Sequence, residues 1–169
     1  MLSIQRAESD ADLRCVEELF WEYLQWGHAK LVEEYGIDLD IELLHQECMQ
    51  NLDKFSPPHG SLLLARDGAR ATGVACMRRL GEGIGEIKRM YVREAYRGQG
   101  IGRALLRQLL EDARTSGYRA VRLDSARFMK EAHALYHSEG FSDIKPYPGS
   151  EVPEQFQEHW LFMEKSLEK

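Results

Sequence analysis

The sequence predicts a mixed α/β (α+β) domain in three layers, with helices flanking a central sheet. Short apolar runs of the kind found in strands alternate along the chain with longer stretches in which apolar residues recur at helical spacing. The length of 169 residues suits one domain, and no repeat or linker divides residues 1–169. Strands and helices mixed in a chain of this size pack as layers around a common core.

The first third of the chain is predicted to be a short strand followed by two helices. The strand is expected over residues 3–6, and Ser9 or Asp10 is expected to cap the helix that follows. Apolar residues recur there at steps of three and four until Gly36 interrupts them before a second helix. A Pro-Pro pair at 57–58 closes the region with a loop.

The middle of the chain is predicted to form three consecutive strands. Residues 61–66 and 71–79 are apolar runs on either side of Asp67-Gly68, a dipeptide that favours a hairpin turn. Residues 84–92 resemble the next strand, but some of their apolar positions lie three apart and so break the alternation of a regular strand. A β-bulge explains this irregularity.

The last part of the chain is predicted to be helix, strand, helix and strand. An apolar face predicts a helix that begins at Ile101 and ends before Gly117. A strand is expected over 118–124, a helix over 128–139 and, after a loop rich in proline, a final strand over 160–163.

Composition argues against several classes of protein. The chain is 43% hydrophobic and 30% charged, as in globular proteins, and no apolar run approaches the roughly 18 residues of a membrane helix. A formal net charge of -6 argues against nucleic-acid binding. Cys15, Cys48 and Cys76 are widely spaced and odd in number, so we expect neither a disulfide framework nor a zinc site. Reduced thiols and the lack of a signal-peptide pattern predict a cytoplasmic protein without a membrane partner.

The net charge hides an asymmetry along the chain. Residues 1–55 contain 13 acidic and 4 basic residues, whereas residues 78–107 contain 8 basic and 3 acidic residues. This distribution suits a protein that binds an anion through residues 78–107 and a cation through residues 1–55. Charges on solvated faces produce the same pattern. The acidic residues that would suit a cationic ligand, or else form a solvated turn, are Glu33, Glu34, Asp38, Asp40 and Glu42.

The segment 97–102, Arg-Gly-Gln-Gly-Ile-Gly, lies between a predicted strand and a predicted helix. Its alternating glycines let the backbone approach a ligand, and the helix that follows presents unpaired N–H groups. Together they predict an anion site suited to a pyrophosphate, to which Arg97 and Arg103 would add charge. A glycine turn that merely begins a helix is the alternative. The Gly-Lys-Ser/Thr of a Walker loop is absent, and the third glycine is misplaced for a dinucleotide fingerprint.

Residues 85–92, 96–106 and 134–141 resemble the GNAT superfamily of acyl-CoA-dependent N-acyltransferases, and the R-x-x-G-x-G element that begins at Arg97 is similar to its pyrophosphate loop. The similarity covers about residues 61–141. It implies a mixed, mostly antiparallel sheet with a bulged, splayed strand. It also implies acetyl transfer from acetyl-CoA to a small amine, a peptide N-terminus or a lysine, by direct attack in a ternary complex.

The resemblance also implies roles for individual residues. Tyr136 would protonate the leaving thiolate, and Glu86 would act as the base that takes the proton of the amine. The alternatives are a core position for Tyr136, and for Glu86 an exposed strand position paired with Lys88 or Arg78. Backbone groups of the strand would hold the pantetheine arm, and those of the loop the pyrophosphate. The residues implied in cofactor binding are Met90, Tyr91, Val92, Arg97, Gly98, Gln99, Gly100, Ile101, Gly102 and Arg103.

Two other functions fit parts of the sequence. A non-catalytic acyl-CoA-binding regulatory module would keep the glycine loop, and an interaction protein built on the aromatic first helix would bind no CoA. Trp21 and Trp26 lie off the apolar stripe of that helix and are candidates for an acceptor pocket or a homodimer contact. Met129 stands where many members of the superfamily have Asn. His133 and His137 lie four apart, but H-E-x-x-H is absent and no metal is expected.

Overall fold

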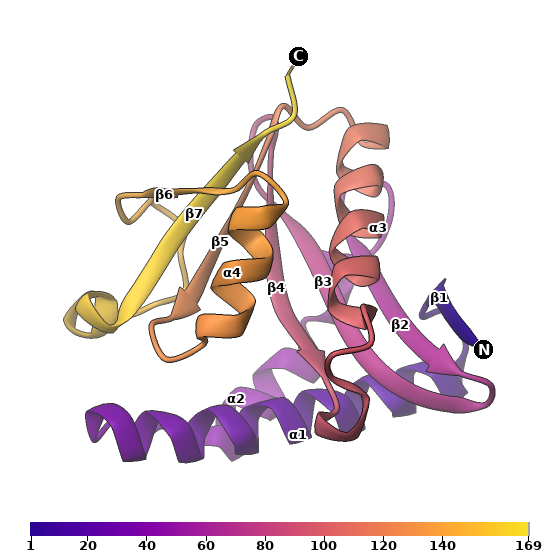
Figure 1. Ribbon diagram of the computed structural model, residues 1–169, viewed down its shortest axis with the longest axis horizontal. Coiled ribbons are helices and arrows are strands. Elements are labelled where there is room, and N and C mark those ends of the chain that lie inside the picture. The colour runs from indigo at the N-terminus through magenta and orange to yellow at the C-terminus, as the bar shows by residue number, and fades with distance from the viewer. Residues whose placement is uncertain (169) are drawn as a thin grey trace.

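The computed structural model describes residues 1–168, whose strands form a seven-stranded sheet with helices on both faces (Figure 1). The strand order is β1-β2-β3-β4-β5-β7-β6, and every neighbouring pair is antiparallel except β4 and β5. This mixed, mostly antiparallel sheet confirms the predicted fold class. The strands are Leu2–Arg6 (β1), Ser61–Asp67 (β2), Arg70–Gly81 (β3), Ile84–Val92 (β4), Ala120–Ala126 (β5), Ser142–Ile144 (β6) and Trp160–Ser166 (β7).

The helices form the two outer layers, with α3 against one face of the sheet and α1 with α2 against the other (Figure 1). The short β6 and three 3-10 helices were not predicted, because segments of three to six residues carry too few positions to show a period. The α-helices are Asp10–Tyr35 (α1), Ile41–Gln50 (α2), Ile101–Thr115 (α3) and Lys130–Ser138 (α4), and the 3-10 helices are Leu52–Phe55, Glu94–Tyr96 and Glu154–His159.

The sheet separates two apolar cores, and β3 contributes to both. Because successive side chains of a strand point to opposite faces, Ala75 and Met77 pack on the α3 side while Val74 and Cys76 pack on the α1 side. Each fully buried leucine of α3, such as Leu105, contributes roughly 1.5–3 kcal/mol to folding. The two cores pack against both faces of β3 and β4 in the middle of the sheet.

The start of α1 shows which residue caps the helix. The Ser9 hydroxyl accepts a hydrogen bond from the Asp12 N–H at 3.1 Å, and the Asp12 carboxylate accepts one from the Ser9 N–H at 3.2 Å. This capping box makes Ser9 the cap and Asp10 the first helical residue, which decides between the two predicted caps. At the other end, Gly36 adopts the left-handed conformation (φ 65°) that ends the helix where its pattern was interrupted.

The β-bulge predicted in residues 84–92 is present in β4. Val74 of β3 pairs with Tyr91 and Cys76 pairs with Lys88, so two residues of β4 lie opposite one residue of β3. One of the two, Arg89, has a φ of +50°, which is uncommon for a residue other than glycine. The bulge therefore confirms the prediction from the broken alternation.

The parallel strands β4 and β5 pair only over their first halves. Their pairing ends at Ile87 and Leu123, although β4 continues to residue 92 and β5 to residue 126 (Figure 1). Beyond that point β5 stays paired with β7, so β4 and β5 diverge. This split leaves one edge of residues 88–92 without a neighbouring strand among the described residues.

Candidate functional site

A groove of about 680 Å³ runs along the second half of β4, the glycine loop before α3 and the start of α4. Of the ten residues expected to bind the cofactor, all except Gln99 line this groove. Sequence reasoning missed Lys30 and Phe128, which also line it, because they come from α1 and from the turn before α4. Trp26, a candidate for an acceptor pocket or a homodimer contact, instead lines this groove.

The glycine loop has a backbone geometry that suits an anion. Gly98 and Gly100 have φ values of +80° and +83°, and a Cβ added at either position would meet no atom within 4 Å. Side chains of Ser9 and Asp40 cap α1 and α2, whereas no side chain caps α3, so the N–H groups of its first turn are left for a ligand. An uncapped helix start beside a groove favours an anion such as a pyrophosphate.

The two arginines expected beside this loop are held differently. Arg97 donates from Nε to the Val92 carbonyl at 2.9 Å, and its guanidinium lies 5.0 Å from the centre of the Trp26 ring. These contacts hold its positive charge in the groove. Arg103 is ion-paired with Glu139, which neutralises much of its charge. The structure therefore favours Arg97 as the cationic group of the site.

The edge of β4 forms the wall of the groove next to the split. Met90, Tyr91 and Val92 line the groove where β5 has diverged. A strand edge without a neighbour can hydrogen-bond an extended ligand as an added strand would. The bulge at Arg89 and Met90 changes the direction of this edge relative to the rest of β4.

Tyr136 lies on α4, where its side chain is 6% exposed and its ring packs against Phe141. Burial raises the pKa of the Tyr136 phenol well above its usual range, and the nearby Tyr23 and Asp124 add to the rise. The phenol therefore keeps its proton at neutral pH and can act only as a donor to an anion. Its neighbour Leu135 lines the groove, whereas Tyr136 itself is not among the lining residues.

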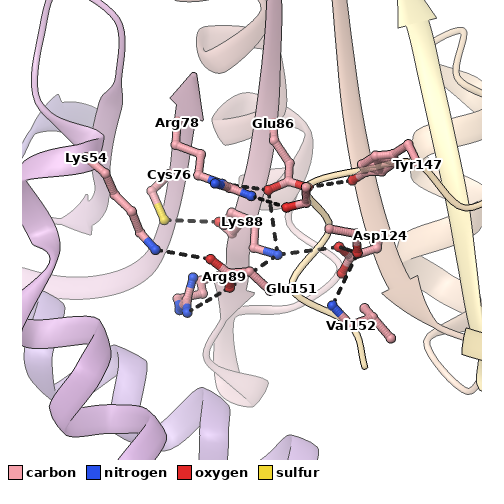
Figure 2. Close-up of polar contacts among 12 residues, drawn as sticks. Lys54, Cys76, Arg78, Glu86, Lys88, Arg89, Asp124, Tyr147, Glu151 and Val152 are labelled. Carbon is pink, nitrogen blue, oxygen red and sulfur yellow. Dashed lines mark hydrogen bonds and ion pairs between the residues drawn. The ribbon is translucent and has the colours of Figure 1, made fainter. Parts of the chain in front are cut away.

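Glu86 is fully buried in the sheet, so the alternative of an exposed strand position does not apply to it. Its Oε1 accepts a hydrogen bond from Arg78 Nε at 2.8 Å, and its Oε2 accepts one from the Tyr147 hydroxyl at 2.6 Å (Figure 2). The pairing with Arg78 was expected, but the partner Tyr147 was not, because 61 positions separate it from Glu86 in the sequence. Both oxygens of the proposed base are therefore occupied by protein donors.

A cluster of charged side chains occupies the point where β4 and β5 diverge (Figure 2). Lys88 Nζ lies 3.4 Å from Asp124 Oδ2, 3.8 Å from Glu86 Oε1 and 3.7 Å from Glu151 Oε2. Burial favours the neutral amine, but the three carboxylates outweigh it and raise the pKa of Lys88. Lys88 is therefore a buried cation that joins three acidic groups.

The same cluster holds the loop over residues 146–152. The Ser150 hydroxyl donates to Asp124 Oδ2 at 3.1 Å, and Arg78 donates to the Gly149 carbonyl at 2.7 Å. With the Tyr147 contact to Glu86 (Figure 2), these bonds fasten the loop beside the split. The sequence predicted a loop here from its prolines, but not its position.

We expect the ion pairs of Glu151 to make the free energy of unfolding depend on pH in the acidic range. Burial disfavours its charged form, but Lys88, Arg89 and Lys54 outweigh this and lower the pKa of Glu151 from 4.5 to about 2. Because the folded pKa is the lower one, the stabilisation is present above pH 4.5 and is lost as the pH falls toward 2. Its size is about 1 kcal/mol or less, because Glu151 is 39% exposed and water screens its charge.

The measurement is urea unfolding of the wild type and of Glu151→Gln between pH 7 and pH 3. The difference in unfolding free energy is expected to be constant above about pH 5 and to shrink below it. Glu154→Gln, at an exposed position of the same region, is the matched control and should show no such trend. A Glu151→Gln difference that stays constant down to pH 3 would contradict the prediction.

The two histidines that lie four apart have separate partners. His133 Nε2 contacts the Ser125 hydroxyl at 3.0 Å, and His137 Nε2 contacts Asp143 Oδ1 at 2.8 Å. Within residues 1–168, no group of three His, Cys, Asp or Glu side chains is placed to hold a metal ion. None of the helices over the same residues has the length and apolar character needed to cross a membrane.

Comparison with solved structures identifies the fold. PaiA N-acetyltransferase from Thermoplasma acidophilum, solved in complex with coenzyme A, superposes with a TM-score of 0.74 at 20% identity, over 98% of this chain and 99% of that chain. YncA of Salmonella typhimurium, solved with acetyl-CoA, has a TM-score of 0.66 at 24% identity, over 99% of this chain and 95% of that chain. Both likenesses cover nearly the whole of each chain.

Comparison of sequences identifies the family. Residues 14–141 match the model of the Acetyltransferase (GNAT) family. An uncharacterized N-acetyltransferase of Schizosaccharomyces pombe is 32% identical over 155 residues, which is 90% of this chain and 90% of that protein. IAA acetyltransferase of Azospirillum brasilense is 33% identical over 146 residues, which is 85% of this chain and 93% of that protein. The chain therefore belongs to the GNAT acetyltransferase family.

Proposed function

We propose that this protein transfers an acetyl group from acetyl-CoA to a primary amine. The observation that carries the proposal is the groove itself, which has an uncapped helix start at the glycine loop and an unpaired strand edge along β4. The helix start suits the pyrophosphate, and the strand edge suits the amide-containing pantetheine arm. The thioester would then reach the split between β4 and β5, near Tyr136.

The proposed reaction is a direct attack in a ternary complex. The ammonium form of the acceptor first loses a proton, and the neutral nitrogen attacks the thioester carbonyl carbon to form the C–N bond. The nitrogen then loses its second proton to water, the C–S bond breaks and the thiolate takes a proton from Tyr136. Tyr136 recovers its proton from solvent, so no covalent enzyme intermediate is formed.

The removal of the amine proton is proposed to involve Glu86 indirectly. Arg78 and Tyr147 occupy both of its oxygens, so an amine could touch the carboxylate only by displacing one of them. Glu86 is connected to the split through Lys88, which also contacts Asp124. We therefore propose that Glu86 acts through this cluster rather than by direct contact with the acceptor.

The test is thiol release from acetyl-CoA with a broad panel of amines, amino acids and peptides. Turnover that depends on an amine would support the proposal. Tight binding of acetyl-CoA, measured by calorimetry, without turnover on any acceptor would instead favour a non-catalytic acyl-CoA-binding module. An absence of acetyl-CoA binding would contradict the assignment of the groove.

Gly100→Ala is expected to weaken CoA binding about tenfold, because alanine at a φ of +83° costs about 1–2 kcal/mol and the loop would relax away from the ligand. Calorimetric titration with CoA measures the change. Gly68→Ala is the matched control, since Gly68 has a φ of +60° and equally open space but lies in the hairpin between β2 and β3. Equal CoA affinity in Gly100→Ala and the wild type would argue against the loop as the anion site.

A further inference from the structure

A second, smaller cavity opens beside the groove, between α1, α2 and the ends of β5 and β7. Its volume is about 160 Å³, and it shares Phe128 and Met129 with the groove. A protein cavity of about 150 Å³ is large enough to bind benzene. Its position at the split and its shared wall place it where an acceptor would meet the thioester.

The walls of this cavity are mainly apolar. Apolar side chains form most of the lining, among them Leu24, Leu31, Leu39, Ile41, Leu44 and Trp160, and the polar residues that also line it are Tyr23, His28, Asp124 and Ser125. A polar acceptor would lose its hydration against such walls without replacement hydrogen bonds. The lining therefore favours a ligand with an apolar body.

Asp124 is the only carboxylate that lines the cavity in the part of the chain described. Both of its side-chain contacts, to Lys88 and to Ser150, are made by Oδ2, and none of the residues 1–168 donates a hydrogen bond to Oδ1. Oδ1 can therefore accept one N–H from a ligand. The adjacent Lys88 cation, 3.4 Å from Asp124, disfavours additional positive charges on a ligand placed there.

The acidic residues that would suit a cationic acceptor lie outside this cavity. All are exposed around the end of α1 and the start of α2, and none of them lines the cavity: Glu33, Glu34, Asp38, Asp40 and Glu42. His28, which does line it, is bonded to Asp38 at 2.7 Å. These acidic residues therefore give no support for a polycationic acceptor within the site.

We propose that the acceptor is a small primary amine with a single amino group and an apolar alkyl or aryl body of about the size of a phenyl ring. The body occupies the 160 Å³ cavity, and the nitrogen donates a hydrogen bond to Asp124 Oδ1 beside the groove. This inference rests on the proposed acetyl transfer and specifies its substrate class.

The first experiment measures kcat/KM by thiol release for ethylamine, propylamine, butylamine and 2-phenylethylamine, with spermidine as a polycationic comparison. Each CH₂ added to the alkyl chain is expected to raise kcat/KM about fourfold, because it moves from water into the apolar cavity. Spermidine is expected to be at least about tenfold poorer than butylamine, since its other charged groups meet the leucine walls or Lys88.

The second experiment fills the cavity. Gly27 of α1 lines it, and a Cβ added there would meet no atom within 4 Å, so Gly27→Leu places a side chain in open space. This change is expected to lower kcat/KM for 2-phenylethylamine at least about tenfold and for ethylamine much less. The affinity for acetyl-CoA should stay within about twofold of the wild type, because CoA is proposed to occupy the groove and not this cavity. Ala29→Leu, at an exposed position of the same helix, adds the same side chain outside the cavity and should change neither value.

The outcomes separate this inference from the function on which it rests. Turnover that is independent of alkyl length, or better with spermidine than with butylamine, would overturn the apolar-amine inference while acetyl transfer stands. An equal loss for large and small amines in folded Gly27→Leu would also overturn it. Turnover with none of these amines or the broader panel, although acetyl-CoA binds, would overturn the proposed function itself.

Discussion

Tyr136→Phe is expected to lower kcat at least roughly 100-fold while the affinity for acetyl-CoA changes little. The phenol is buried and its raised pKa keeps it protonated, so it can donate to the sulfur as the C–S bond breaks. Phenylalanine keeps the ring that packs against Phe141 but has no proton to donate. The measurement is single-turnover thiol release with a saturating amine, together with calorimetry for acetyl-CoA.

Tyr118→Phe is the matched control for this change. Tyr118 is equally buried, but its hydroxyl already donates to the His59 carbonyl, and it lies near Arg79, whereas Tyr136 lies near Asp124 at the split. Its loss should reduce stability by about 1 kcal/mol and leave kcat unchanged. If Tyr136→Phe turned over at the rate of the wild type, Tyr136 would not be the acid, and burial in the core would be its role.

Glu86→Gln is expected to reduce the unfolding free energy by about 3–5 kcal/mol, which lowers Tm by roughly 10 °C. Glu86 is fully buried between Arg78 and Lys88, and the substitution leaves these cations without one of their counter-charges. Glutamine is close in shape to glutamate, so the loss would come from charge rather than from a cavity. Thermal and urea unfolding measure it, with the exposed Glu82→Gln as a control that should stay within about 0.5 kcal/mol.

The same variant tests the proposed part of Glu86 in proton transfer. If Glu86 receives the proton through the cluster, Glu86→Gln has a lower kcat than the wild type even at temperatures well below its Tm, where the variant is folded. The increase of its rate with pH is then also altered. If Glu86 only holds β3, β4 and the loop over 146–152 together, kcat at low temperature stays within a few-fold of the wild type. In that second case the base role would be abandoned.

The parts of the site that could be predicted from the sequence depend on local backbone geometry. Three alternating glycines before an apolar helix indicate positive φ values and an open helix start, and the structure has both at Gly98 and Gly100. The spacing of apolar residues in 84–92 indicates a bulge, and the register of β4 against β3 shows one. These features involve neighbouring residues, so their signal lies within a single window of sequence.

The surroundings of Glu86 show what could not be predicted. Arg78, one of the two partners considered for it, lies across a hairpin, whereas its other hydrogen-bond partner, Tyr147, comes from a distant loop. Asp124 carries no signal of its role in the sequence, yet it joins Lys88 and Ser150 and lines the smaller cavity. Lys88 and Asp124 are 36 positions apart, and no periodicity in either strand indicates that they meet.

The sequence by itself determined the order of the longer strands and helices, the bulge in β4 and the glycine loop, because each arises from short-range periodicity or from the backbone freedom of a few residues. Only the tertiary structure decided that β4 and β5 part after Ile87 and Leu123, and what fills the space between them. Burial, counter-charges and cavity volume depend on segments that the fold brings together from positions far apart in the chain. The groove could therefore be predicted from its motifs, whereas the apolar cavity and the charge cluster beside it could not.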